Sequence, residues 1–189
     1  MRLMATALGL SLLAGGTTSA GTAIGDKLDP FTLKDAAGKD VSLASYKDKK
    51  ALVLIFVATR CPVSNAYNKR MEAIAQAYTA KGVGVVGINA NKEETPTEIA
   101  EHAQKNGLTF PILKDAGNVY ADRFGAQVTP EAYVYDQGMV LRYHGRIDDD
   151  RSGQNIQSKD LEGALDALLG GKTVPTAETK AFGCTIKRQ

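Results

Sequence analysis

Apolar and polar positions alternate along the chain in a pattern that predicts interleaved strands and helices. Continuous apolar runs at 51–58 and 82–89 are typical of buried strands in a parallel sheet. Between them lies a series of apolar residues spaced by three and four, as on one face of a helix: Val63, Tyr67, Met71, Ile74 and Tyr78. Strand, helix and strand in this order predict a parallel βαβ unit.

The flanking segments extend this α/β pattern. The apolar segments 31–33 and 41–43 flank the turn sequence 35–38 and predict an N-terminal β-hairpin. Further along, the pattern predicts helices over 95–106, 118–124 and 159–169, a short strand over 111–113, and a hairpin from 132–135 and 139–147. We therefore expect an α/β fold with a central mixed sheet, helices on both faces and an N-terminal hairpin extension.

The first twenty residues have the pattern of an export signal. Arg2 precedes a mostly apolar stretch from Leu3 to Leu13, and small residues lead up to Ala20. The stretch is too short for a membrane-spanning helix. We expect cleavage after Ala20 and a periplasmic or secreted protein without stable membrane insertion, with a retained N-terminal anchor as the alternative.

Composition narrows the choice of partners. The chain has 189 residues and a formal net charge of +2, which gives no electrostatic reason to expect nucleic acid or an anionic membrane as a partner. After the signal, we expect one domain over residues 21–171 and a C-terminal tail over 172–189. The chain has two cysteines, Cys61 and Cys184, and the tail carries the second.

Cys61 occupies the junction between the first buried strand and the helix that follows it. Pro62 takes the first helical position, where its missing N–H costs nothing. A thiol at this place faces unpaired backbone N–H groups and the positive end of the helix dipole, which favour the thiolate. Arg60 adds a positive charge nearby. We expect Cys61 to have a depressed pKa and to alkylate faster than Cys184.

Several segments carry a resemblance to a known family. The segment FVATRCPVS (56–64) resembles the F-x-A-x-x-C-x-x-C motif of thioredoxin-like proteins, with Cys61 at the first cysteine and Ser64 replacing the second. Val128-Thr129-Pro130 is similar to the cis-proline loop of that superfamily. The run 118–150 and the tail sequence AFGCTIKR resemble its peroxiredoxin-like (AhpC/TSA-redoxin) branch. The resemblance implies a thioredoxin-like fold.

The resemblance also implies an activity and a site. Cys61 is expected to act as nucleophile in thiol–disulfide exchange with a protein or small-molecule redox partner. A cis Thr129–Pro130 bond is expected to leave the Thr129 backbone N–H and C=O free to pair with an extended substrate. Thr59 and Ser64 are expected to flank the sulfur, with the Ser64 hydroxyl donating a hydrogen bond to the thiolate.

Two departures from the family pattern limit this expectation. Ser64 cannot form a disulfide, so the thioredoxin dithiol is absent. In peroxiredoxins the peroxidatic cysteine aligns with the second cysteine of the thioredoxin pair, which is Ser64 here. We therefore expect a thiol oxidoreductase whose peroxidase activity is weak.

Cys184 has three interpretations. It is a resolving cysteine that attacks a sulfenic acid or mixed disulfide at Cys61, a structural staple that fixes the tail, or a free cysteine under the tail. An exported chain with two cysteines favours pairing in general.

No cofactor beyond the cysteines is expected, and no metal site. Gly82, Gly84 and Gly87 spell G-x-G-x-x-G, but a helix precedes them and they lie inside a predicted strand, unlike a dinucleotide-binding loop. His102 and His144 lack the companions and spacing of a zinc site.

Two rival functions use the same cysteines. Cys61 and Cys184 as thiolates have the softness that suits Cu(I), although no Met or His lies close to either in sequence. The other rival is a redox-inert binding module with a structural Cys61–Cys184 disulfide.

Overall fold

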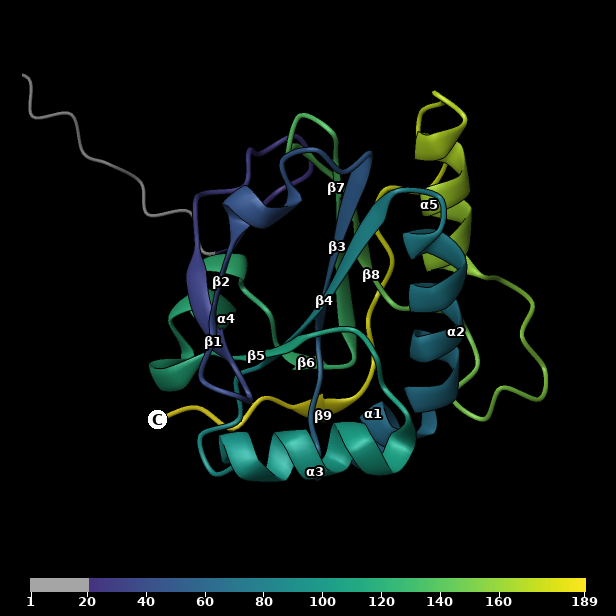
Figure 1. Ribbon diagram of the computed structural model, residues 1–189. Helices are drawn as coiled ribbons and strands as arrows, with labels where there is room; N and C mark the ends of the chain where they lie inside the picture. Colours follow the sequence, from purple (N-terminus) through teal and green to yellow (C-terminus); the bar gives the residue numbers. More distant parts are fainter. Residues whose placement is uncertain (1–20) are drawn as a thin grey trace, which may run out of the picture.

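Seven strands form one mixed sheet in the computed structural model, which describes residues 21–189 (Figure 1). The segment 1–20, expected to be an export signal, lies outside the described residues. In spatial order the strands are β2 (Asp40–Ser42), β1 (Thr32–Asp35), β5 (Ile112–Lys114), β4 (Val83–Asn89), β3 (Ala51–Phe56), β7 (Glu131–Asp136) and β8 (Leu141–Gly145). β4 runs parallel to both β3 and β5, and the other neighbours are antiparallel.

β3 lies near the centre of the sheet and is buried along its whole length. Its side chains alternate between two cores: Ala51, Val53 and Ile55 belong to one, and Leu52, Leu54 and Phe56 to the other. This is the period of a strand covered on both faces. The predicted buried strand and the parallel βαβ unit are confirmed.

Five α-helices surround the sheet (Figure 1): α1 (Pro62–Ala66), α2 (Asn68–Thr79), α3 (Pro96–Asn106), α4 (Val119–Phe124) and α5 (Asp160–Leu169). Side chains of α2 and α5 join the core on one face, and those of α4 join the core on the other. Residues 21–189 also contain two 3-10 turns, η1 (Leu43–Tyr46) and η2 (Ala116–Asn118). The thioredoxin-like α/β fold, with its N-terminal hairpin β1–β2, is confirmed. Within residues 21–189 no helix has the length and apolar character needed to span a bilayer.

The helix predicted after Cys61 is divided into α1 and α2. Tyr67 lies at the break with φ −93° and ψ −7°, and its N–H donates to the Ser64 carbonyl at 3.0 Å in a tight turn. The buried Tyr67 hydroxyl hydrogen-bonds to Asp148 at 3.1 Å, which ties this break to the loop after β8. The expected apolar face is otherwise present, because Met71, Ile74 and Tyr78 are all buried.

α3 begins and ends as its sequence predicts. Thr95 and Glu98 form a reciprocal capping box, and Pro96 occupies the first turn. Gly107 ends the helix in the left-handed conformation, with φ 64°.

Backbone pairing holds the tail after α5 against the rest of the fold. It first lies along β8, where the His144 N–H donates to the Ala177 carbonyl and the Thr179 N–H donates to the His144 carbonyl. It ends with strand β9 (Cys184–Thr185), which pairs antiparallel with β6 (Val128–Thr129). Figure 1 shows the tail passing beside β6 and α1 on its way to the C-terminus. Hydrogen bonds to β8 and β6, which are both distant in sequence, hold this segment in place.

Gly145, the last residue of β8, gives the first prediction. A Cβ atom at Gly145 would lie 2.1 Å from Thr179 Oγ1 and 2.4 Å from the Thr179 carbonyl oxygen, so Gly145→Ala should push the tail from the sheet. We expect the free energy of unfolding to fall by about 1–3 kcal/mol. Urea unfolding of the purified variant measures this change.

Gly163→Ala is the matched control. Gly163 lies inside α5 with open space around the position of a Cβ, so the same substitution should raise the free energy of unfolding by up to about 1 kcal/mol. Equal effects at the two glycines would contradict the close packing of the tail against β8.

Candidate functional site

Cys61 is the N-cap residue of α1, and the short segment 57–60 connects it to the carboxyl end of β3. Its backbone is extended, with φ −85° and ψ 116°, and Pro62 begins the helix. The Ser64 backbone N–H donates to the Cys61 Sγ at 3.2 Å. The predicted placement at a helix N-terminus is therefore confirmed, and it brings an N–H donor and the positive helix end to the sulfur.

Cys61 and Cys184 form a disulfide, with their Cα atoms 5.9 Å apart and a sequence separation of 123. Cys61 is 5% exposed, whereas Cys184 is partly exposed. The interpretation of Cys184 as a free cysteine is wrong. The other two interpretations, a resolving cysteine and a structural staple, both require this bond.

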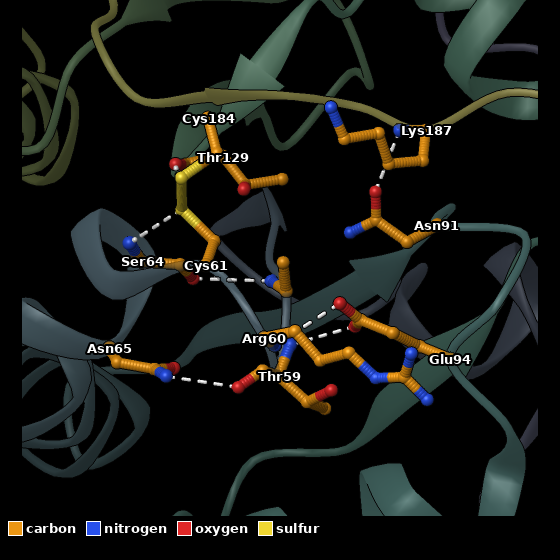
Figure 2. The surroundings of a disulfide bond; sticks show 11 residues. Thr59, Arg60, Cys61, Ser64, Asn65, Asn91, Glu94, Thr129, Cys184 and Lys187 are labelled. Atoms are coloured by element: carbon orange, nitrogen blue, oxygen red, sulfur yellow. Dashed lines mark hydrogen bonds between the residues drawn. A yellow bond between two sulfur atoms is a disulfide. The ribbon is translucent and has the colours of Figure 1, made fainter.

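The Thr129–Pro130 bond is cis, as the resemblance implies. The loop faces the disulfide, and the Thr129 carbonyl oxygen lies 3.4 Å from the Cys61 Sγ (Figure 2). The expectation of a free Thr129 backbone is wrong for the disulfide form, because Thr129 pairs with Cys184 and Val128 with Thr185. The tail itself occupies the position that was assigned to an extended substrate.

Ser64 and Thr59 flank Cys61 in sequence but differ in their hydrogen bonds. Ser64 is fully buried, and its Oγ accepts a hydrogen bond from the Ala58 N–H at 3.1 Å. The contact with the sulfur comes from the Ser64 backbone N–H and not from its hydroxyl. The Thr59 carbonyl accepts a hydrogen bond from the Asn65 side chain at 2.9 Å, while its Oγ1 is buried without a partner. Substrate contact by Thr59 or Ser64 stays a prediction.

Glu94 is a site residue that the sequence analysis missed. Its carboxylate is buried and accepts hydrogen bonds from the Thr59 N–H at 2.7 Å, the Arg60 N–H at 3.1 Å and the Asn89 side chain at 2.6 Å. These bonds fix the segment that leads into Cys61. A signal was available, because Glu94 follows the predicted strand 82–89, and the carboxyl ends of parallel strands meet at one edge of a sheet.

The Arg60 charge is not directed at the sulfur. Its guanidinium pairs with Glu98 and lies 3.9 Å from a Glu93 carboxylate oxygen. Figure 2 shows its side chain extending away from Cys61. The neighbouring carboxylate of Glu98 holds the pKa of Arg60 above its usual value. The expected electrostatic help from Arg60 is thus largely neutralised, and of the two features expected to favour a Cys61 thiolate only the helix N-terminus lies at the sulfur.

Glu131, the residue after the cis-proline, accepts hydrogen bonds that fix the preceding loop residues. Burial by itself raises the pKa of Glu131, but hydrogen bonds from His144, from Tyr133 and from the Gln127 and Val128 N–H groups leave that pKa below its usual value. The His144 ring also stacks on Tyr133, with centroids 4.3 Å apart. A carboxylate with these donors fixes residues 127–130, which we call the cis-proline loop.

A pocket of about 300 Å³ opens beside the disulfide. It is lined by both sulfur-bearing residues and by side chains of both charges: Ala58, Arg60, Cys61, Asn91, Glu93, Glu94, Cys184, Thr185 and Lys187. A reagent of small-molecule size can therefore approach the disulfide from this side. In the described part of the chain no cluster of three or more His, Cys, Asp or Glu has the arrangement of a metal site.

Comparison with known proteins identifies the family. Residues 24–144 match the AhpC/TSA family, which is more than half of the chain. The chain belongs to the AhpC/TSA family. A Mycobacterium tuberculosis protein named as a peroxiredoxin is 32% identical over 126 residues, and the match covers 67% of this chain and 78% of that protein. Thiol-disulfide oxidoreductase ResA of Halalkalibacterium halodurans is 27% identical over 121 residues, 64% of this chain and 67% of that protein.

Solved structures match a larger share of this AhpC/TSA protein than the family model does. The crystal structure of a hypothetical protein from Sinorhizobium meliloti 1021 is 36% identical, with a TM-score of 0.84, and covers 89% of this chain and 96% of that one. A secreted Mycobacterium tuberculosis disulfide oxidoreductase, described as homologous to E. coli DsbE, is 25% identical with a TM-score of 0.57. It covers 72% of this chain and 95% of that one. These relatives support the thioredoxin-like fold of the chain.

Glu94 gives the second prediction. Glu94→Ala removes the acceptor of three N–H donors around the approach to Cys61, and we expect the free energy of unfolding to fall by at least about 2 kcal/mol. Glu93→Ala is the control, because the Glu93 side chain is 67% exposed and makes only a long ion pair with Arg60. Its effect should stay within about 0.5 kcal/mol. Chemical unfolding of both variants decides, and equal losses would contradict the role assigned to Glu94.

Proposed function

We propose that this protein is a thiol–disulfide oxidoreductase in which Cys61 and Cys184 alternate between dithiol and disulfide. The observation that carries the proposal is the placement of the bond. It joins a cysteine at a helix N-terminus to a cysteine held on the cis-proline loop, beside a pocket open to reagents. The names of the relatives, a peroxiredoxin and thiol–disulfide oxidoreductases, support the same class of chemistry.

The exchange takes place in two steps. In the oxidising direction, a thiolate of the reduced partner attacks one sulfur of the Cys61–Cys184 bond, which breaks and releases the other sulfur as a thiolate. A second thiolate of the partner then attacks the mixed disulfide and releases the remaining cysteine. Two electrons pass from the partner to the cysteine pair, and the partner leaves as a disulfide. The reverse direction oxidises the pair and reduces a partner disulfide.

Cys61 is the nucleophile of the reverse direction. The Ser64 N–H and the N-terminus of α1 favour its thiolate, which is the attacking species. Cys184 then acts as the resolving cysteine, because β9 places it against Cys61. Thr129 and Pro130 contribute by positioning, because the cis-proline loop pairs with strand β9, which carries Cys184.

Peroxide reduction is the weaker candidate. The family position of the peroxidatic cysteine is taken by Ser64, whose hydroxyl is buried against the Ala58 N–H. The arginine nearest to Cys61 in sequence, Arg60, is engaged by Glu93 and Glu98. A Cu(I) site gains no support from the geometry, because the two candidate ligands are bonded to each other.

We also propose that the chain is exported and that cleavage after Ala20 releases a domain over residues 21–171 with the tail 172–189. The charge and apolar pattern of residues 1–20 supports this placement. The secreted disulfide oxidoreductase among the structural relatives agrees with it. The partner is expected to be a thiol or disulfide protein or a small-molecule thiol.

The third prediction concerns exchange with glutathione disulfide. Reduced wild-type protein should release two glutathione molecules and recover the Cys61–Cys184 bond. Cys184→Ser should stop at a mixed disulfide between Cys61 and glutathione. Cys61→Ser should react at least about tenfold more slowly at pH 7, because an ordinary thiol is only a few per cent thiolate there. Mass spectrometry of acid-quenched samples measures all three.

The two single-cysteine variants serve as controls for each other. Equal rates for Cys61→Ser and Cys184→Ser would remove the special reactivity of Cys61, and with it the proposed function.

Stopped-flow mixing of the reduced wild type with hydrogen peroxide tests the weaker candidate, peroxide reduction. A rate constant above about 10⁵ M⁻¹s⁻¹, within the range of efficient enzymes, would favour a peroxidase.

A further inference from the structure

The pocket beside the disulfide is built from parts of the chain that are distant in sequence. The segments 58–61 and 91–94 contribute one side, and the tail contributes Cys184, Thr185 and Lys187. Its volume of about 300 Å³ is at the small end of the range for ligand pockets, which suits a small molecule. Because both cysteines line the pocket, a molecule bound there lies next to the disulfide.

Asn91 directs an unused hydrogen-bond donor into this pocket. The residue is only 6% exposed, and its Oδ1 accepts a hydrogen bond from the Lys187 N–H at 2.7 Å. This bond decides the orientation of the amide, because only the oxygen can accept. No acceptor within residues 21–189 forms a hydrogen bond with the Asn91 Nδ2. Figure 2 shows this nitrogen pointing into the space beside the disulfide.

Lys187 brings an uncompensated positive charge to the same pocket. Four charged residues line it: Arg60, Glu93, Glu94 and Lys187. Arg60 pairs with Glu93 and Glu98, and the Glu94 carboxylate accepts three hydrogen bonds. Of the four, only Lys187 has a side chain without an ion pair or hydrogen bond in the described part of the chain. Figure 2 shows Asn91 between Lys187, on the tail, and Glu94, which lies beside Arg60.

We propose that Asn91, Thr185 and Lys187 bind the carboxylate of a small thiol that reduces the Cys61–Cys184 bond. An ammonium group, an amide N–H and a hydroxyl are all donors that a carboxylate accepts. Thr185 is exposed and lies two residues before Lys187, on the same side of the extended tail. This inference rests on the proposed function and adds the chemical class of its small-molecule partner. The site consists of side chains around the pocket and does not use the backbone of the cis-proline loop.

The bound thiol reduces the cysteine pair in two steps. Its thiolate attacks the Cys61 Sγ, the bond to Cys184 breaks, and Cys184 leaves as a thiolate that takes a proton from water. The thiolate of a second thiol molecule then attacks the small-molecule sulfur of the mixed disulfide. Cys61 leaves as a thiolate beside the Ser64 N–H. Two electrons pass from the two thiols to the cysteine pair, and the thiols leave joined as one disulfide.

The fourth prediction compares mercaptopropionate with its amide, which has the same length and no charge. Each thiol is mixed in excess with the oxidised wild-type protein, and mass spectrometry of quenched, alkylated samples gives the rate at which the Cys61–Cys184 bond opens. Each rate is divided by the rate of the same thiol with the uncharged disulfide of mercaptoethanol, which removes differences in thiolate fraction and nucleophilicity. We expect the normalised rate of the acid to exceed that of the amide at least about fivefold, because the pocket binds its carboxylate.

Three variants locate this preference. Lys187→Gln removes the charge and should bring the two normalised rates to within about twofold of each other. Asn91→Asp keeps an acceptor for the Lys187 N–H but replaces the free donor by a carboxylate oxygen, so it should abolish the preference too. Lys92→Gln is the matched control, because Lys92 is exposed, follows Asn91 directly and does not line the pocket. It should keep the preference of the wild type, and circular dichroism checks that all three variants are folded.

Other outcomes separate this inference from the proposed function. Equal normalised rates for the acid and the amide with the wild type would overturn the carboxylate site and leave the oxidoreductase intact. A preference that survives both Lys187→Gln and Asn91→Asp, or one that Lys92→Gln abolishes as well, would also overturn the site, since its cause would then lie outside the pocket. A disulfide that neither thiol opens would remove the proposed function, and the inference with it.

Discussion

The backbone of Thr129 stands between the two halves of the site, and the position of the tail depends on it. On one side its carbonyl oxygen contacts the Cys61 sulfur at 3.4 Å, and on the other its residue pairs with Cys184. Gly183 permits this close approach because it has no side chain to meet the Thr129 carbonyl. Glu131 holds the loop in place from within the core. A disulfide across 123 residues of sequence follows from this arrangement.

The reactive end of the site depends on a different constraint, the meeting of parallel strands at one edge of the sheet. β3 leads to Cys61, and β4 leads to Glu94, which binds the backbone N–H groups of Thr59 and Arg60. Because the carboxylate accepts these bonds, the chain enters α1 with Cys61 as N-cap and the Ser64 N–H directed at its sulfur. The position of Cys61 thus relies on a buried carboxylate that follows the neighbouring strand β4.

Local sequence pattern predicted the elements of the fold because each carries its own signal. The apolar run of β3, the capping box of Thr95 and Glu98, and Gly107 all act within a few residues of the structure they specify. The break at Tyr67 escaped prediction, since its side chain is hydrogen-bonded to Asp148 far along the chain.

The same division between local and tertiary signals holds for the candidate site. Cys61 and the cis bond at Pro130 were recognisable from motifs, whereas the pairing of Cys184 with Thr129 and the neutralisation of Arg60 by Glu98 arise only from tertiary contacts.

We propose that the Cys61–Cys184 bond is a working disulfide and not a staple. A staple closing so long a loop would stabilise the fold by about 4–5 kcal/mol and resist reduction. A working bond has one sulfur whose reduced form is stabilised, as the helix N-terminus and the Ser64 N–H provide for Cys61. The direct test is a redox titration of the wild-type protein in dithiothreitol and glutathione buffers, read by thiol labelling. A working disulfide should have a reduction potential above about −300 mV, whereas a more negative value, in the range of structural disulfides, would make the bond a staple.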